Sequence, residues 1–171
     1  MKIKDVKELE KIANNVRIGI IESVYAAKSG HPGGSLSIAD ILTVLYFNQM
    51  NIDETKPQDK SRDRLVLSKG HCAPALYSTL AERGFFEKGL LKTLRNINGK
   101  LQGHPDMNKI PGVDMTTGSL GQGLSAANGM AMASKLGKEG IRVYCICGDG
   151  EMEEGQIWEA AMSSSHYKLD N

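Results

Sequence analysis

Hydrophobic residues recur at steps of three and four along the first part of the chain, at Val6, Leu9, Ala13, Val16, Ile20 and Val24. This spacing predicts a long amphipathic helix. The segment 29–34 (Ser-Gly-His-Pro-Gly-Gly) ends the pattern, because glycine and proline together interrupt helices. A second helix is predicted to begin at Ser37, which stands at capping-box spacing from Asp40. Its body over 41–45 is apolar nearly all round, which predicts burial between other elements.

Short apolar runs over 65–67 and 141–147 predict two buried strands. Further helices are predicted over 73–83, where Gly84 takes the C′ position, near 87–95, over 122–135 and over 156–167. Because helices alternate with short buried strands, the sequence predicts an α/β fold with a parallel sheet flanked by helices.

Two segments show neither the hydrophobic spacing of a helix nor the apolar run of a buried strand. Residues 51–64 are polar and include Pro57, so we expect a surface loop there. Residues 98–118 are interrupted by glycine and proline, which predicts a long irregular loop. Loops of this kind often carry binding and catalytic residues.

The composition is that of an ordinary globular chain, with 40% hydrophobic and 24% charged residues among 171, a length typical of one domain. Lysine and arginine number 21 against 20 acidic residues, a balance that disfavours a nucleic-acid surface or an electrostatic membrane anchor. No apolar run approaches the ~18–20 residues of a membrane span. Charges throughout residues 1–15 disfavour a secretory signal.

Three cysteines, an odd number, are consistent with a reducing cytosol. Cys145 and Cys147 alternate along a predicted strand, so we expect them on one face as small buried hydrophobes. The C-x-C spacing is also compatible with a metal site, although no cluster of further ligands accompanies it.

Three of the four histidines, His31, His71 and His104, follow a glycine in predicted loops. Glycine lets the backbone approach a ligand, and a neutral imidazole can exchange a proton or bond a phosphate oxygen near neutral pH. One such histidine alone would indicate a surface turn, but three with the same context favour a site. His166 lies in a predicted helix, and we expect it to be structural.

Gly148-Asp149-Gly150 directly follows the second predicted strand, and ligands of open α/β sheets bind beyond the carboxyl ends of strands. An aspartate there can hold a divalent cation and its flanking glycines let phosphate oxygens approach, although a simple turn has the same composition. Residues 118–123 (Gly-Ser-Leu-Gly-Gln-Gly) can bring main-chain groups to a ligand, but they match neither a dinucleotide fingerprint nor a P-loop. Acidic residues crowd the segment that follows, at Glu151, Glu153, Glu154 and Glu159. Some of them are expected at a solvated helix start.

Taken in order, these motifs resemble the N-terminal, diphosphate-binding region of transketolase over essentially the whole chain. The matching segments are 29–33, 67–71, 103–105, 111–113, 116–123, 148–150, 154–155 and 159–160. The resemblance implies the thiamine diphosphate-binding fold, the cofactors thiamine diphosphate and Mg²⁺, and transfer of a two-carbon ketol unit between sugar phosphates.

The resemblance also implies roles for individual residues. Asp149 would ligate Mg²⁺, the Gly150 amide and His71 would contact the diphosphate, and Gly118, Ser119 and Leu120 would lie along the cofactor. The catalytic residues implied are His31, His104 and Glu154. The two histidines would line the donor-sugar site and take part in proton transfer. Glu154, with Glu159 as a further candidate, would belong to a carboxylate network near a subunit interface.

Two departures from single-chain transketolases stand out. Residues 33–35 (Gly-Gly-Ser) and 118–121 (Gly-Ser-Leu-Gly) resemble the split form, whose halves are separate chains. In the family, a further strand and an asparagine that completes the Mg²⁺ site follow the aspartate, and Asn171 does not match that asparagine. We therefore expect a single domain, residues 1–171, that lacks its C-terminal part and is inactive alone. Its implied partner is a C-terminal subunit with a pyrimidine-binding domain, in a dimer-based assembly in the cytoplasm, acting in the pentose phosphate pathway.

Two alternatives remain open at this point. Another thiamine diphosphate enzyme, such as 1-deoxyxylulose-5-phosphate synthase, has a related cofactor domain, although the Gly-His-Pro triplets at 30–32 and 103–105 favour transketolase. The second alternative is a non-catalytic remnant that binds a partner through an exposed sheet edge. The three loop histidines and Asp149 disfavour the remnant.

Overall fold

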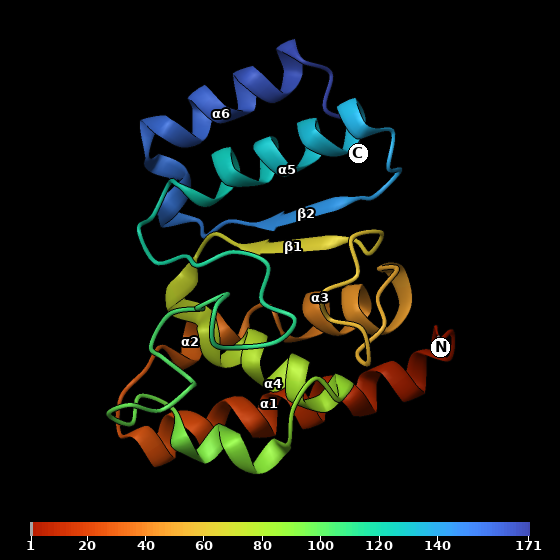
Figure 1. Ribbon diagram of the computed structural model, residues 1–171. Coiled ribbons are helices and arrows are strands. Elements are labelled where there is room, and N and C mark those ends of the chain that lie inside the picture. The colour runs from red at the N-terminus through yellow and green to blue at the C-terminus, as the bar shows by residue number, and fades with distance from the viewer. Residues whose placement is uncertain (1) are drawn as a thin grey trace.

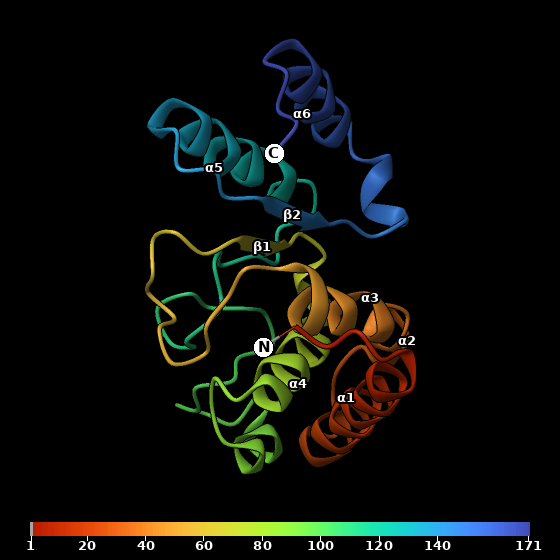
Figure 2. The same cartoon turned by 90° about the vertical axis from the view of Figure 1, so that its right-hand side faces the viewer.

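A computed structural model describes residues 2–171 and has a two-stranded parallel sheet at its centre (Figure 1). Strand β1 (Arg64–Leu67) pairs with β2 (Val143–Ile146) from Arg64 opposite Val143 to Leu67 opposite Ile146. Helices α1–α4 lie on one side of the sheet and α5 and α6 on the other, in both views (Figures 1 and 2). The predicted parallel sheet flanked by helices is confirmed.

The helices follow the predicted periodicity closely. The α-helices are α1 (Val6–Ala27), α2 (Pro32–Leu36), α3 (Ala39–Val44), α4 (Ala73–Arg83), α5 (Gly123–Gly137) and α6 (Gly155–His166). Short π or 3-10 turns are η1 (Leu45–Gln49), η2 (Gly70–Cys72), η3 (Lys88–Thr93) and η4 (Gly150–Glu153). Gly84 ends α4 with a φ of 98°, as its predicted C′ position requires. In the part of the chain that the structure describes, no helix is long and apolar enough to cross a membrane.

One hydrophobic core joins α1, α3, α4 and the sheet, and Leu65 and Leu67 of β1 lie within it. Tyr144 and Ile146 of β2 pack against the same core. Cys145 and Cys147, which alternate with them, share the other face, with their sulfur atoms 3.9 Å apart. The shared face was predicted, but the prediction that the two cysteines are buried is wrong, because both are only half-buried.

The predicted helix start at Ser37 is wrong. The chain already turns into α2 at Pro32, whose fixed φ suits the first position of a helix, and α3 begins separately at Ala39. The Ser37 hydroxyl donates backwards to the Gly34 carbonyl at 2.8 Å, and Asp40 forms an exposed ion pair with Arg17. Neither residue of the expected capping box caps the helix.

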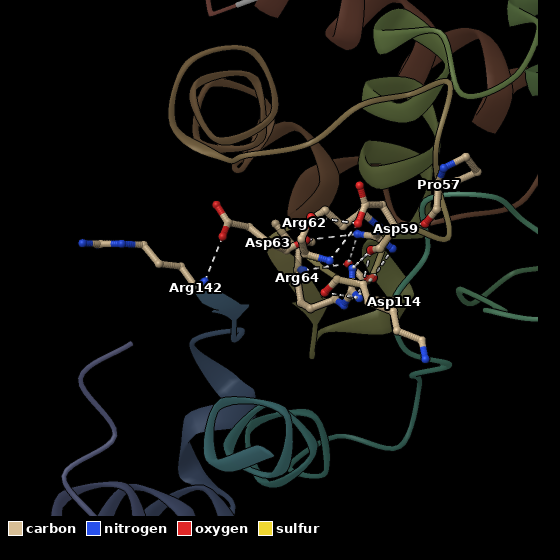
Figure 3. A network of polar contacts seen from close by, with 10 residues as sticks. Pro57, Asp59, Arg62, Asp63, Arg64, Asp114 and Arg142 are labelled. Atoms are coloured by element: carbon tan, nitrogen blue, oxygen red, sulfur yellow. Dashed lines mark hydrogen bonds and ion pairs between the residues drawn. The ribbon is translucent and has the colours of Figure 1, made fainter. Parts of the chain in front are cut away.

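Residues 51–63 of the predicted loop are irregular, whereas Arg64 belongs to β1. Arg62 and Asp63 are buried rather than on the surface, and Figure 3 shows their polar contacts. The carboxylate of Asp63 accepts the Asn51 N–H at 2.7 Å and the Arg142 N–H at 2.8 Å. The Arg62 guanidinium is paired with the buried carboxylate of Asp114. These contacts join the end of the loop to Arg142, the residue before β2, and to the loop 98–118 at Asp114.

Candidate functional site

Segments that are far apart in sequence meet around one hollow of about 470 Å³ at the carboxyl ends of β1 and β2. The hollow is lined by Lys69, His71, Leu120, Asp149, Gly150 and Glu151, together with Gly33, Gly34, Ser37 and Gly148. Four residues proposed from the sequence as cofactor or metal ligands are therefore brought together: His71, Leu120, Asp149 and Gly150. The parallel register explains this arrangement, because both strands end at the same edge of the sheet.

The three glycine-linked histidines are neighbours. The rings of His31 and His71 lie with their centroids 5.1 Å apart and an angle of 73° between their planes. Partial burial lowers the pKa of His71 from its ordinary value, and the nearby His31 and Lys69 lower it further. Partial burial, Arg95 and His31 lower the pKa of His104 in the same way. His71 and His104 are therefore neutral imidazoles near neutral pH, able to accept as well as donate hydrogen bonds.

His104 is held through its backbone and against a glycine. The Tyr77 hydroxyl donates to the His104 carbonyl at 2.9 Å. A Cβ on Gly118, whose φ is 146°, would lie 3.0 Å from the His104 ring. Glycine at this position lets the imidazole pack directly on the backbone of the segment that leads to Leu120.

Gly70 and Gly118 bring two of the site loops into backbone contact. A Cβ on Gly70 would lie 2.7 Å from the Gly118 nitrogen, which is closer than side chains approach backbone. The Thr117 hydroxyl also donates to the Leu67 carbonyl at 2.7 Å. The end of β1 and the loop after residue 116 therefore form one unit.

Five of the residues proposed from the sequence do not line this hollow: His31, His104, Gly118, Ser119 and Glu154. Ser119 is exposed and lines a separate hollow of about 260 Å³ with Thr116, Thr117 and Gln122. Glu154 is exposed at the start of α6, with its Cβ beside Gly121. The further candidate Glu159 is also exposed on α6.

Sequence reasoning missed two residues of the site, Lys69 and Glu151. Lys69 is only 7% exposed, and its Nζ donates to the Gly34 carbonyl at 3.1 Å and to the Ser37 hydroxyl at 3.2 Å. Glu151 is 2% exposed, whereas Glu153, Glu154 and Glu159 are exposed, as expected for some of these acidic residues. Their positions in the sequence could have indicated them, because Lys69 lies two residues after the end of β1 and Glu151 directly follows Gly148-Asp149-Gly150.

The family assignment rests on the whole chain and not on this hollow alone. The sequence model of a family described as "Transketolase, thiamine diphosphate binding domain" matches residues 8–171. The chain belongs to the transketolase family. The motifs that indicated transketolase in the sequence lie within the matched range.

Two relatives are subunits of transketolases. The chain is 47% identical over 166 residues to an apulose-4-phosphate transketolase subunit from Phocaeicola vulgatus, covering 97% of this chain and 59% of that protein. It is 50% identical over 164 residues to the 6-deoxy-6-sulfo-D-fructose transketolase subunit SqwG of a Clostridium species, covering 96% of this chain and 60% of that protein. The chain thus spans about 60% of the length of these relatives.

The fold also matches part of a transketolase crystal structure. The crystal structure of the Campylobacter jejuni transketolase superimposes with a TM-score of 0.90 at 38% identity, covering 98% of this chain and 28% of that one. The α/β architecture, with its parallel sheet between helices, is therefore that of the transketolase cofactor domain.

Proposed function

We propose that this chain is the diphosphate-binding part of a split transketolase. Such an enzyme transfers a two-carbon ketol unit between sugar phosphates with thiamine diphosphate and Mg²⁺. The observation that carries the proposal is the single hollow in which Asp149, Gly150, His71 and Lys69 meet. The relatives described as transketolase subunits support the split arrangement.

The residues around the hollow fit a metal-bound diphosphate. Asp149 offers a carboxylate, and Mg²⁺ in proteins commonly binds one or two carboxylates together with phosphate oxygens. Lys69 and His71 offer nitrogen donors for the remaining phosphate oxygens. At Gly33 and Gly150, a Cβ would meet no atom within 4 Å outside its chain neighbours and the backbone of its own turn, so both positions are open to a ligand.

Each residue has a role in this proposal. Asp149 holds Mg²⁺, while His71, Lys69 and the Gly150 amide hold the diphosphate. Leu120, with Gly118 and Ser119, lies along the rest of the cofactor. When bound, thiamine diphosphate supplies the electron sink for the two-carbon unit, so the protein has to place groups and handle protons.

His31 and His104 act on the sugar in this proposal. Both are exposed beside the hollow, where an imidazole can bond sugar hydroxyls. The lowered pKa of His104 favours the neutral form, which can accept a proton from a hydroxyl near neutral pH. Glu154, exposed at the start of α6, contributes to a carboxylate network with a neighbouring subunit.

The partner in this proposal is a C-terminal subunit that carries the pyrimidine-binding domain, in a dimer-based assembly. Its substrates are sugar phosphates of the kind interconverted in the pentose phosphate pathway. Three free cysteines support a reducing compartment, the cytosol, and the balanced charge supports neither a nucleic-acid nor a membrane partner.

Isothermal calorimetry on the complete native protein tests the cofactor site. Thiamine diphosphate should bind in the presence of Mg²⁺, and Asp149→Ala should abolish that binding. Glu153→Gln, which removes an exposed charge four residues away, should bind as the wild type does. A wild-type protein without binding, or an Asp149→Ala variant with full affinity, contradicts the proposal.

An activity assay tests the split arrangement. Ketol transfer between sugar phosphates should require added C-terminal subunit. Turnover above the blank by the chain of residues 1–171 alone would show that no partner is needed.

A further inference from the structure

Glu151 is a buried carboxylate with three hydrogen-bond donors around it. Its Oε1 accepts the Gly121 N–H at 3.0 Å and the Ser68 hydroxyl, and its Oε2 accepts the Gly148 N–H at 2.9 Å. No lysine or arginine forms an ion pair with it among residues 2–171. Hydrogen bonds therefore satisfy both carboxylate oxygens, as buried polar groups in a protein interior require.

The three donors belong to three separate segments of the chain. Ser68 follows β1, Gly121 belongs to the loop before α5, and Gly148 follows β2. Glu151 lies 83 residues from Ser68 and 30 residues from Gly121 in sequence. One side chain therefore bonds to all three segments, whereas each other hydrogen bond there joins only two: the Ser68 N–H donates to the Ile146 carbonyl, and the Thr117 hydroxyl donates to the Leu67 carbonyl.

Each donor is the immediate neighbour of a residue that lines the hollow. Lys69 follows Ser68, Leu120 precedes Gly121, and Asp149 follows Gly148. A change in any of the three hydrogen bonds moves the backbone that carries one of these side chains. The distances across the hollow between the side chains of Lys69, Leu120 and Asp149 thus depend on Glu151.

We propose that Glu151 is a positioning residue that fixes the three loops of the cofactor site before the ligand binds. The identity of that ligand rests on the proposed function, whereas the connection between the loops rests on the hydrogen bonds of Glu151. Because its carboxylate is occupied by three protein donors, Glu151 acts through its neighbours rather than on the cofactor.

Both carboxylate oxygens are needed, which makes glutamine an informative replacement. A carboxamide has nearly the same volume, but one of its two ends is an NH₂ group. In one orientation this group faces the Gly148 N–H, and in the other it faces the Gly121 N–H. Glu151→Gln therefore places donor against donor at one of the two loops, whichever way it turns.

Amide hydrogen exchange on the complete native protein without ligand tests the connection directly. Glu151→Gln should raise exchange at least tenfold at Gly121, Gly148 or both, and leave the amides in the middle of α4 unchanged. The matched control, Glu153→Gln, removes an exposed carboxylate from the same turn and should change neither. A rise spread evenly over the core amides of Glu151→Gln would indicate global destabilisation and overturn the proposal.

Binding and kinetics test the consequence for the cofactor. Glu151→Gln should weaken thiamine diphosphate binding at least tenfold in the presence of Mg²⁺. In the assembled enzyme, kcat at saturating cofactor should stay within about twofold of the wild type, because only the pre-arranged loops are lost. Ser68→Ala, which removes one of the three bonds, should give a smaller loss of affinity.

The outcomes separate this inference from the proposed function. If the wild type does not bind thiamine diphosphate while Glu151→Gln still loosens the loops, the proposed function fails and the positioning role stands. If the wild type binds and Glu151→Gln binds equally well with unchanged exchange, the positioning role fails and the proposed function stands.

Discussion

Asp114 accepts hydrogen bonds from both terminal nitrogens of the Arg62 guanidinium, 52 residues away in sequence (Figure 3). The same carboxylate accepts the Leu65 N–H at 2.8 Å, and its side chain is only 3% exposed. The C-terminal part of the loop 98–118 is thereby fixed to the start of β1 at Asp114. Four residues later, Gly118 meets Gly70 beyond the end of β1.

Asp114→Ala should therefore destabilise the protein strongly. Removing one partner of a buried ion pair leaves an uncompensated charge and typically costs about 3–5 kcal/mol. Urea denaturation should show that loss in the free energy of unfolding. Asp40→Ala, which breaks the exposed pair with Arg17, should cost less than about 1 kcal/mol. Equal losses in the two variants would contradict the importance of the buried pair.

Gly70→Ala and Gly129→Ala should change stability in opposite directions. A Cβ on Gly70 meets the Gly118 backbone, which cannot yield as a side chain would, so we expect a cost of about 1–3 kcal/mol. Gly129 lies within α5 with open space where a Cβ would stand. There, alanine should stabilise the protein by about 0.5–1 kcal/mol through its helix propensity. Thermal unfolding of both variants checks the signs, and a neutral Gly70→Ala would argue against the backbone contact.

Local patterns predicted the elements well and the long-range contacts poorly. The spacing that begins at Val6 and the glycine at position 84 depend only on neighbouring residues, and both predictions are confirmed. Ser37 matched a capping pattern, but Pro32 starts a helix earlier and the hydroxyl bonds elsewhere. A local signature fails when a stronger local constraint lies just before it.

In the candidate site, too, residues marked by a local pattern could be predicted, whereas residues defined by long-range contacts could not. His71 and Asp149 could be predicted because each follows a strand in a glycine-containing turn. Glu151 could not be distinguished from its acidic neighbours, because its burial depends on Ser68 and Gly121, which only the folded chain brings near. The pairing of Arg62 with Asp114 was hidden for the same reason.

Cys147 should react with iodoacetamide faster than either other cysteine. The Cys145 thiol lowers the pKa of Cys147 by hydrogen bonding to its sulfur, and the same bond raises the pKa of Cys145. Burial raises the pKa of Cys72. Because the thiolate is the reactive form, Cys147 should be alkylated several-fold faster at pH 7.5. Mass spectrometry of the alkylated peptides measures the three rates.

The Cys145→Ala variant tests the cause. Without the thiol donor, the pKa of Cys147 should rise and its alkylation should slow at pH 7.5. Cys145→Ser retains a donor and should keep most of the reactivity. If Cys147 reacts equally fast in both variants, the hydrogen bond does not control it.

Stability should decrease as the pH falls below about 6.5, the ordinary value for a histidine. The pKa values of His71 and His104 are lowered in the folded state, so the unfolded chain takes up protons at a pH where the folded chain does not. Proton uptake by the unfolded chain favours unfolding, and the loss is complete once the pH is below the lowered pKa values. Urea midpoints at pH 7.5, 6.5 and 5.5 should therefore decline. His71→Asn and His104→Asn should each flatten part of this decline, and the double variant should flatten it more than either alone. A wild-type midpoint that is constant over this range, or a double variant with the full decline, would show that these two imidazoles are not the source.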